Sequence, residues 1–312
     1  MIRVLGTGGK PAYVGAMDHT RRNANLMLLL AAAIWGFAFV AQRVGMRHVG
    51  PLTFNGIRFL LGAAALVPFI VVRLRRRGAG WSPGLLRAGL VAGLLIFGGA
   101  TLQQWGLVRT TAGKAGFITS LYVVFTPLLG LMFGQRSAGA AWVGAILAAI
   151  GLYLLSATGL ASLAPGDGLV LLSALCWAGH VLWVGQAAPR IDPLQLALVQ
   201  FLTCAGLSLA GAAILESPAP GAIGAATLPI LYAGLLSVGV AYTLQVLAQR
   251  HARPAPAAVI LSLESVFAAV GGWLVLGEVL ALRGLVGCAL MLGGVMVSQL
   301  GPVRSRPRAS GS

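Results

Sequence analysis

Acidic residues are scarce in this chain. Its 312 residues contain only six Asp and Glu, against 22 Lys and Arg, and charged residues of both signs make up 9% of the total. A soluble globular domain is usually about a quarter charged. This scarcity, with an apolar fraction of 58% and a mean hydropathy of +0.90, argues that water is not the main solvent of the chain. The net charge of +16 would suggest a nucleic-acid partner on a soluble protein, so its meaning depends on where the charges lie.

Cysteines and catalytic motifs are equally sparse. Cys176, Cys204 and Cys288 all fall inside apolar runs, their number is odd, and no metal-ligand spacing involves them. The chain has no HExxH and no GxSxG motif, and Gly113-Lys114 is followed by Ala115 where a phosphate loop needs Ser or Thr. The sequence therefore predicts neither an enzyme nor an ATP-driven pump, and it predicts no cofactor and no metal.

Long uncharged apolar runs dominate what is present. A membrane-spanning helix needs about 20 mostly apolar residues, and buried strands are much shorter. Ten runs meet this requirement, and most joins between them carry Gly, Pro or Arg clusters. The runs cover residues 26–44, 53–72, 87–107, 115–134, 138–157, 168–186, 194–214, 228–248, 255–276 and 282–300. The predicted fold class is an all-α integral membrane bundle of ten transmembrane helices, with the lipid bilayer as its surroundings.

The basic residues indicate how this bundle is oriented. With the N-terminus inside, sixteen Lys and Arg fall on the cytoplasmic side, five fall on the opposite side, and Arg58 alone lies within a run. Cytoplasmic loops of membrane proteins carry such an excess of positive charge. We therefore predict an inner-membrane protein with both termini in the cytoplasm, and we interpret the high net charge as a record of topology rather than of nucleic-acid binding.

The two halves of the chain repeat each other at an offset of about 142 residues. Trp35 then aligns with Trp177, Pro51 with Pro193, and the residues 101–103 (TLQ) with 243–245 (TLQ). Because each half holds five runs, the second half must enter the membrane from the opposite side. Inverted repeats are typical of secondary transporters, although a duplication kept only for packing would give the same pattern.

The residues also carry a resemblance. Residues 103–107 (QQWGL) and 110–130 (TTAGKAGFITSLYVVFTPLLG) resemble the third and fourth helices of the EamA branch of the drug/metabolite transporter superfamily. Residues 262–269 (SLESVFAA), with 276–278 (LGE), resemble its ninth helix, and 58–61 (RFLL) its second. The resemblance implies ten helices, cytoplasmic termini and transport of small metabolites, often outward. Two positions depart from the family pattern, namely Ser265, where proline is common, and Gln135, where glutamate is usual.

These observations define the expected organisation. We expect a cytoplasmic N-terminal tail at residues 1–25 and a first EamA-like repeat of helices 1–5 at 26–157. A second repeat of helices 6–10 is expected at 168–300, followed by a basic cytoplasmic C-terminal tail at 301–312.

Two charged side chains lie inside apolar runs, where each costs roughly 2.5 kcal/mol or more. Glu264 is ten residues beyond Pro254, close to the predicted midplane. Its carboxyl could take up and release a proton during transport, bind a cationic group of the substrate, or only fasten the ninth helix to a neighbour. Arg58 lies nearer the external side, and we expect it to satisfy carbonyls, pair with a carboxylate or extend its head outward.

Six further residues are candidates for a substrate-binding cavity. Gln103 and Gln245 are repeat mates that could line the two halves of a pathway or only join helices. Trp35 and Trp177 are also mates, Tyr122 is the mate of Glu264, and His180 lies one turn beyond Trp177. Together these four could form an aromatic and polar wall, although a lone histidine in an apolar helix is more often simply hydrogen-bonded.

The predicted function is a secondary transporter of small metabolites by alternating access, exporting amino-acid-like or drug-like solutes, with protons as one option for coupling. The alternative is a membrane-embedded structural or interaction protein whose polar residues serve only packing. That alternative predicts that Glu264, Gln103 and Gln245 face neighbouring helices without a shared cavity. An intramembrane enzyme would need two convergent groups, and Glu264 with His180 is the pair that the sequence offers.

Overall fold

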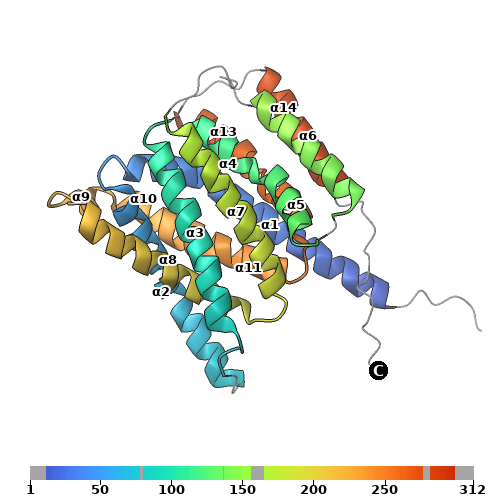
Figure 1. Ribbon diagram of the computed structural model, residues 1–312, viewed down its shortest axis with the longest axis horizontal. Helices are drawn as coiled ribbons and strands as arrows, with labels where there is room; N and C mark the ends of the chain where they lie inside the picture. Colours follow the sequence, from blue (N-terminus) through green and yellow to red (C-terminus); the bar gives the residue numbers. More distant parts are fainter. Residues whose placement is uncertain are drawn as a thin grey trace, which may run out of the picture.

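The computed structural model describes residues 12–77, 80–110, 112–135, 137–155, 165–276 and 282–298. Every regular element in these ranges is a helix (Figure 1). The helices are α1 (Ala12–Gly45), α2 (Pro51–Arg77), α3 (Leu85–Leu107), α4 (Ala112–Ser120), α5 (Tyr122–Met132), α6 (Gly139–Leu155), α7 (Asp167–Ala187), α8 (Pro193–Leu215), α9 (Ala222–Ala225), α10 (Thr227–Leu231), the π-helix η1 (Tyr232–Tyr242), α11 (Thr243–Gln249), α12 (Pro254–Leu261), α13 (Glu264–Leu276) and α14 (Leu282–Ser298).

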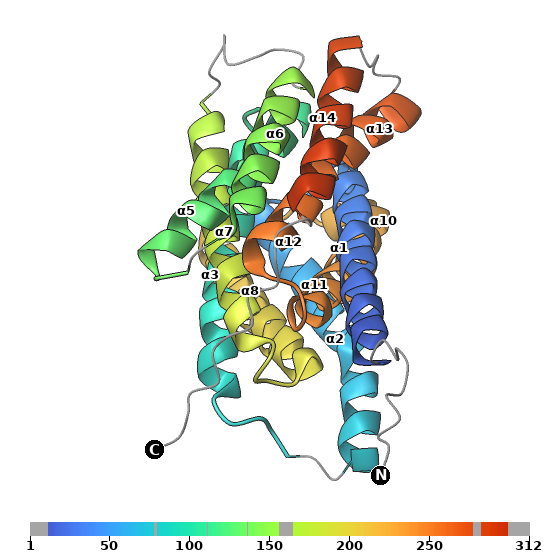
Figure 2. The ribbon, with the colours of Figure 1, turned by 90° about the vertical axis from the view of Figure 1, so that its right-hand side faces the viewer.

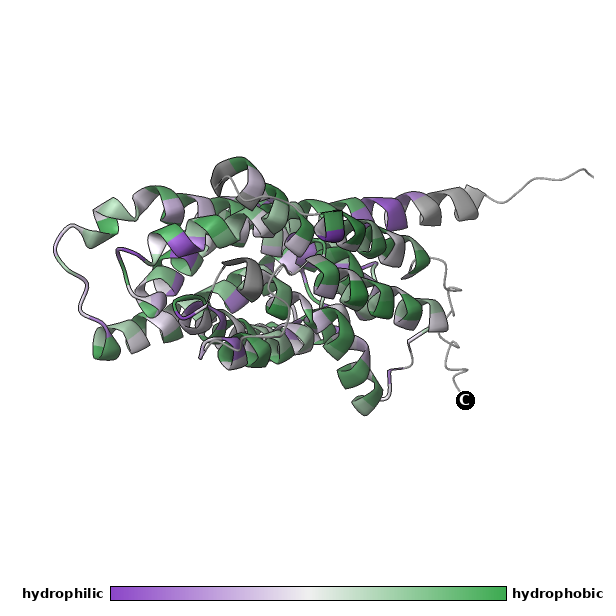
Figure 3. Cartoon of the chain, turned by 90° about the horizontal axis from the view of Figure 1, so that it is seen from above, coloured by the Kyte–Doolittle hydropathy of each residue, from purple (hydrophilic) through white to green (hydrophobic). Residues whose placement is uncertain are grey.

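Eight helical stretches are long and apolar enough to cross a membrane, among the residues that the structure describes. Two shorter apolar helices, α6 and α14, coincide with the fifth and tenth runs of the sequence. Large apolar side chains point outward on these helices, as Phe69 (66% exposed) and Ile214 (81% exposed) do, and Figure 3 shows apolar residues along most of the ribbon. Such an apolar exterior fits contact with lipid chains, because exposing so much apolar surface to water would be unfavourable.

The first helix begins earlier than predicted. We expected a tail up to residue 25, whereas α1 is already helical from Ala12. No proline occurs between Ala12 and Pro51, so no proline prevents the helix from extending beyond the N-terminal end of the apolar run. Residues 1–11 and the predicted tail at 301–312 lie outside the described residues.

Two of the membrane-crossing stretches are interrupted at matching places, which we call the helix breaks. At Leu121, between α4 and α5, and at Ser262 and Leu263, between α12 and α13, the backbone hydrogen bonds shift locally to an i→i−3 pattern. Leu121 (φ −61°, ψ −11°) and Ser262 (φ −62°, ψ −14°) keep right-handed helical dihedrals, so each chain direction continues across the break. These positions are aligned by the internal repeat. The absence of a proline at Ser265 therefore does not prevent a break in the ninth run, which occurs just before that residue.

Helices α6 and α14 lie side by side in both ribbon views (Figures 1 and 2). A Cβ on Gly144 would lie 2.6 Å from the carbonyl oxygen of Gly294, and one on Gly151 would lie 2.5 Å from that of Gly287. Gly144 and Gly287 are aligned by the repeat, as are Gly151 and Gly294. The repeat therefore converts each of these contacts into the other. A two-fold axis between the two helices would relate the contacts in the same way.

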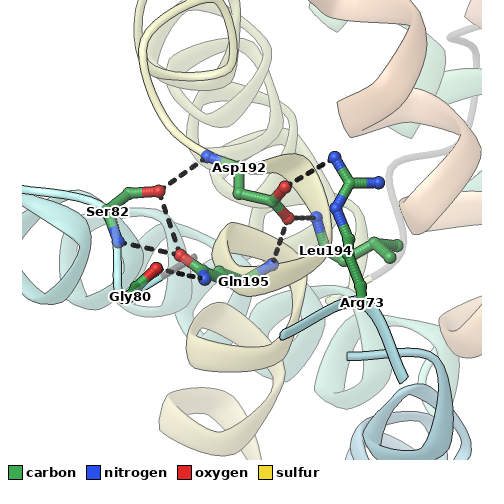
Figure 4. Close-up of polar contacts among 6 residues, drawn as sticks. All are labelled: Arg73, Gly80, Ser82, Asp192, Leu194 and Gln195. Carbon is green, nitrogen blue, oxygen red and sulfur yellow. Dashed lines mark hydrogen bonds and ion pairs between the residues drawn. The ribbon is translucent and has the colours of Figure 1, made fainter. Parts of the chain in front are cut away.

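A polar cluster fixes the end of α2 against the start of α8 (Figure 4). Asp192 caps α8 by accepting hydrogen bonds from the backbone N–H groups of Leu194 (3.0 Å) and Gln195 (3.3 Å), and Arg73 Nη2 lies 2.8 Å from its second carboxylate oxygen. Gln195 Oε1 accepts hydrogen bonds from the backbone N–H (2.9 Å) and hydroxyl (3.0 Å) of Ser82. The connection between α2 and α3 is thereby held at the N-terminus of α8.

At the opposite end of the same helix pair, Glu216 follows α8 and accepts hydrogen bonds from the backbone N–H groups of Leu52 and Thr53, each at 2.8 Å. These are donors of the first turn of α2, which have no partner within the helix. Helices α2 and α8 thus run antiparallel and are joined by an acidic residue at each end.

Candidate functional site

A central cavity lies where both broken stretches meet α1, α2, α3, α7, η1 and α11. Its volume is about 50 Å³. All eight residues singled out from the sequence line it: Glu264, Gln103, Gln245, Tyr122, Trp35, Trp177, His180 and Arg58. Seven further residues, which sequence reasoning missed, complete the lining: Phe39, Gln42, Thr119, Val181, Ser237, Tyr242 and Leu261.

The helix breaks bring Tyr122 and Glu264 to this cavity. Each is the first residue of the helix that follows its break, and both are buried, at 4% and 5% exposed. Ser120, at the end of α4, donates a hydrogen bond to Glu264 Oε1 (3.4 Å) and shares another with the hydroxyl of Ser265. The two broken stretches therefore contact each other directly through small polar side chains.

The repeat mates Gln103 and Gln245 have different surroundings. Gln103 Oε1 accepts a hydrogen bond from Trp177 Nε1 (2.9 Å), and its Nε2 donates to Gln42 Oε1 (3.4 Å). Gln245 Oε1, by contrast, is buried without a hydrogen-bond partner among the described residues. Gln103 therefore joins three helices in addition to lining the cavity, while Gln245 keeps a free acceptor.

Aromatic side chains form one wall around Tyr242, the last residue of η1. Its ring centroid lies 4.6 Å from that of Trp35, and 6.1 Å from those of both Trp177 and His180. Trp35 Nε1 donates to the backbone carbonyl of Ser237 (3.1 Å), inside the π-helix. Single π-turns are common at functional sites, whereas long π-helices are rare. Here η1 places both Ser237 and Tyr242 at the cavity.

His180 and Arg58 occupy the side of the cavity formed by α2 and α7. His180 Nε2 is hydrogen-bonded to Gln200 Oε1 (3.0 Å), so the histidine is both bonded within the bundle and exposed to the cavity. Arg58 is 3% exposed, and its guanidinium carbon lies 5.0 Å from the ring centroid of Phe59 and 5.6 Å from that of Phe54.

Of the three expectations for Arg58, which included hydrogen bonds to backbone carbonyls, pairing with a carboxylate and extension outward do not agree with this arrangement. No carboxylate of the described residues lies within 4.0 Å of its nitrogens, and the side chain stays inside the bundle. Aromatic faces stabilise a guanidinium by cation–π attraction, which explains how Arg58 remains buried without an acidic partner.

Several buried polar atoms around the cavity have no partner in the described part of the chain. They are Arg58 Nε, Thr119 Oγ1 and Gln245 Oε1. Buried polar atoms are nearly always hydrogen-bonded in native proteins, so such a group needs an explanation. Together they offer an N–H donor, a hydroxyl and an acceptor to a polar ligand within an aromatic wall, and the Tyr122 hydroxyl lies beside the Glu264 carboxyl. No group of three or more potential metal ligands occurs among the described residues.

The EamA-like transporter family matches the chain over residues 22–157 and again over 164–299. An uncharacterized transporter of Archaeoglobus fulgidus is 32% identical over 300 residues, covering 92% of this chain and 89% of that protein. A probable amino-acid metabolite efflux pump of Salmonella typhimurium is 28% identical and covers 93% of this chain and 99% of its own length. The uncharacterized inner membrane transporter YedA of Escherichia coli (strain K12) is 29% identical over 53% of this chain and 56% of its own.

One solved crystal structure of a protein shares the fold, with a TM-score of 0.71 at 21% identity, over 89% of this chain and 96% of that one. The twofold family match covers most of the described helices, and the apolar exterior agrees with a membrane location. The chain belongs to the EamA-like transporter family and is an integral membrane transporter.

Proposed function

We propose that this transporter is a secondary carrier that exports small amino-acid-like or drug-like solutes across the cytoplasmic membrane by alternating access. The observation that carries the proposal is the central cavity, where buried polar atoms without partners face an aromatic wall. The Salmonella typhimurium relative, whose name describes amino-acid metabolite efflux, supports the same class of solute.

The chemistry of the lining favours a solute that combines polar and apolar parts. Arg58 is a permanent cation that can bind a carboxylate, and Glu264 can bind an ammonium group or a proton. The rings of Trp35, Trp177 and Tyr242 offer faces for an apolar side chain. A polyanion such as a nucleotide sugar would meet only one lining arginine.

Alternating access is supported by the size of the cavity. A volume of about 50 Å³ holds a few water molecules, since one water needs roughly 10–15 Å³. A metabolite therefore enters only after the walls move. The helix breaks beside Tyr122 and Glu264 offer places for such movement, because the regular α-helical hydrogen bonding is locally interrupted there.

We also propose that the chain forms ten crossing helices in two inverted five-helix repeats, at residues 26–157 and 168–300, with both termini in the cytoplasm. Three observations support this arrangement: the aligned helix breaks, the reciprocal glycine contacts of α6 and α14, and the excess of basic residues on one side.

A membrane-embedded scaffold is the competing proposal. It expects the intramembrane polar residues to face only neighbouring helices, whereas Glu264, Gln103 and Gln245 all line one cavity. An intramembrane enzyme acting through Glu264 and His180 is disfavoured, since relatives that are named for an activity are a transporter and an efflux pump.

The first test is flux through purified protein in liposomes. Radiolabelled leucine and other amino acids should cross faster with the protein than without it, and a pH gradient should change the rate if Glu264 carries the proton. Glu264→Gln should then remove the dependence on the gradient, because an amide cannot take up the proton.

Glu216→Gln is the matched control, since it makes the same chemical change at an acid outside the cavity. It should keep the gradient dependence. A Glu264→Gln protein that is folded and still responds to the gradient would disprove the proton role, and a full panel of solutes without protein-dependent flux would disprove the carrier.

A further inference from the structure

A second group of buried polar side chains lies beside the central cavity, between α2 and α8. Asn55 precedes Arg58 on α2 by one helical turn, and Ser208 is on α8; Asn55 and Ser208 are 0% exposed. The Arg58 guanidinium lies close to Cys204 of α8, and Cys204 Sγ is 3.9 Å from Ser208 Oγ. We call Asn55, Arg58 and Ser208 the Asn55 cluster.

On α2, the side chain of Arg58 extends towards Asn55. Side chains of a helix point back towards its N-terminus, over the preceding turn. The guanidinium carbon of Arg58 lies 5.6 Å from the ring centroid of Phe54, which is four residues earlier and next to Asn55 in the chain. The guanidinium is therefore at the level of the turn that carries Asn55.

Ser208 lies at the same level on the facing helix. A Cβ on Gly56 would lie 3.2 Å from the backbone nitrogen of Leu209, so α2 and α8 approach closely at these two residues. Asn55 and Ser208 directly precede them in the chain. Because both side chains are fully buried, they face the interior of the bundle rather than lipid.

The hydrogen-bonding groups of the Asn55 cluster are largely unused. Arg58 Nε and both polar atoms of the Asn55 amide are buried without a partner in the described part of the chain. The rings of Phe54 and Phe59 stabilise the face of the guanidinium, but its N–H groups lie in the guanidinium plane and are not satisfied by rings. Buried donors of this kind are nearly always hydrogen-bonded, so the cluster lacks a ligand.

The charge of the cluster indicates what that ligand is. No carboxylate of the described residues lies within 4.0 Å of the Arg58 nitrogens, and a buried charge without a partner is strongly unfavourable. A guanidinium and an amide N–H₂ both donate hydrogen bonds, and a carboxylate accepts two or more of them. The missing group is therefore an anion with several acceptor sites.

The internal repeat does not reproduce the cluster. The mates of Asn55 and Ser208 are Ala197 and Leu66, and the mate of Arg58 is the neutral Gln200. The chain thus has one such arrangement and not two. A solute with a single carboxylate matches it better than a solute with two.

Resting on the proposed carrier function, we propose that the Asn55 cluster binds the carboxylate of the solute, while the remainder of the solute lies in the central cavity. Arg58, which lines the cavity, pairs with the carboxylate, and Asn55 and Ser208 donate hydrogen bonds to it. Asn55 and Ser208 do not line the cavity in this conformation, so the carboxylate reaches them when the walls part. The site selects monocarboxylates over amines without a carboxylate.

Binding is tested without transport, by thermal unfolding of the detergent-solubilised protein. Leucine, isocaproate and isoamylamine share a side chain, and isoamylamine alone lacks the carboxylate. Because a ligand that binds the folded state raises the unfolding temperature, leucine and isocaproate should each raise it by several degrees near saturation. Isoamylamine should not. Equal shifts with all three, or none with either carboxylate, would overturn the proposal.

Asn55→Asp supplies the missing anion from the chain itself. Its carboxylate would lie beside Arg58, so the unfolding temperature without ligand should rise and the shift with isocaproate should disappear. Asn23→Asp makes the same change at an exposed site on α1 and should keep the shift. A folded Asn55→Asp protein that retains the full shift would contradict the proposed site.

Asn55→Leu provides a second variant should the aspartate prevent folding. Leucine has a similar size and removes both unsatisfied amide groups, so the protein should remain folded. Because a hydrogen bond to a charged group is lost, the half-saturating concentration of isocaproate should rise by about tenfold or more. Asn23→Leu is the control and should leave it unchanged. An unaltered half-saturating concentration in Asn55→Leu would exclude Asn55 from the site and overturn the proposal.

An inorganic anion such as chloride would satisfy the same donors. Unfolding is therefore also measured in chloride-free buffer and with added sodium chloride. A shift with chloride that Asn55→Asp abolishes, without any shift with isocaproate, would assign the site to inorganic anions and overturn the proposal. A shift with isocaproate in chloride-free buffer that chloride reduces supports it.

Transport provides the last test, in liposomes with leucine and isoamylamine. Asn55→Leu should raise the KM for leucine about tenfold while changing its maximal rate little, and it should not raise the KM for isoamylamine. Equal effects on both solutes would contradict recognition of the carboxylate. If no solute is carried at all, the proposed function fails, while the unfolding temperatures still decide whether the Asn55 cluster binds a carboxylate.

Discussion

At the scale of single residues, four of the six acids of the chain lie at the N-terminus of a helix. Asp192 caps α8, Glu216 caps the start of α2, and Asp167 begins α7, where it accepts a hydrogen bond from Thr110 (2.7 Å). Negative groups at helix N-termini are stabilised by the helix dipole. Glu264 also begins a helix, α13, but it does so inside the bundle and at a cavity. Its location at the cavity therefore distinguishes it from the other three acids, none of which lines that cavity.

Arg58 is predicted to bind the carboxylate of the solute. Arg58→Gln gives it the side chain of its repeat mate, Gln200, which keeps hydrogen bonding and removes the charge. Because a hydrogen bond to a charged group contributes about 1.5–3 kcal/mol, the KM for leucine should rise by about one to two orders of magnitude.

The control for Arg58→Gln is the transport of isoamylamine, which has no carboxylate and should keep its KM. An equal loss for both solutes, or a large fall in the thermal unfolding temperature, would show that Arg58 acts on the fold and not on the solute.

Eight cavity residues could be identified from the sequence, because they are polar or aromatic residues within apolar runs and several are paired by the repeat. A polar group within the membrane is costly and therefore often functional. Gln42 could have been found in the same way, since it lies two helical turns beyond Trp35 on the same face of α1. Thr119 carries no such signal, because threonine often bonds its own helix. Tyr242 depends on the register of η1, which no sequence pattern indicated.

At the scale of helices, the repeat alignment predicted equivalent positions but not the helix breaks. Leu121, Ser262 and Leu263 include no glycine or proline, the residues by which breaks are usually predicted. Pro127, which does break hydrogen bonding, lies within α5. The breaks lie where small hydroxyl side chains of the two stretches meet, and such a tertiary contact cannot be predicted from one segment alone.

The contact of α6 with α14 should be sensitive to a single methyl group. Gly144→Ala would place its Cβ 2.6 Å from the Gly294 carbonyl oxygen, so the helices must separate. Overpacking of this kind costs typically about 1–3 kcal/mol, and the thermal unfolding temperature in detergent should fall. Gly293→Ala on α14 is the matched control, because a Cβ there meets nothing within 4 Å. Equal unfolding temperatures for the two variants would contradict the close contact.

Asp192 combines two interactions that substitution can separate. Asp192→Asn keeps the helix cap and loses the ion pair with Arg73, whose side chain is 33% exposed, so the loss of stability should be under about 1 kcal/mol. Asp192→Ala loses the cap as well and should cost about 1 kcal/mol more. Unfolding temperatures of the two variants measure the difference, and a larger loss for Asn than for Ala would contradict the capping role.

At the scale of the whole molecule, the composition predicted that the chain lies in a membrane. The repeat predicted which distant helices share a site. The family match in two stretches agrees with this view of the chain. The second cavity, which lies where α5 ends and α12 begins, could not be predicted, because residues far apart in sequence line it and its position depends on where the helices end.

The central claim is that one cavity binds the solute alternately from each side, and counterflow tests it most directly. Liposomes loaded with unlabelled leucine are diluted into a trace of radiolabelled leucine, and a carrier with an alternating site accumulates the label transiently above its external concentration. We predict this overshoot for the wild-type protein and its loss in Arg58→Gln, with Glu216→Gln as the control that retains it. An absence of overshoot for every amino acid that the protein moves, or an overshoot unchanged in folded Arg58→Gln, would contradict the account.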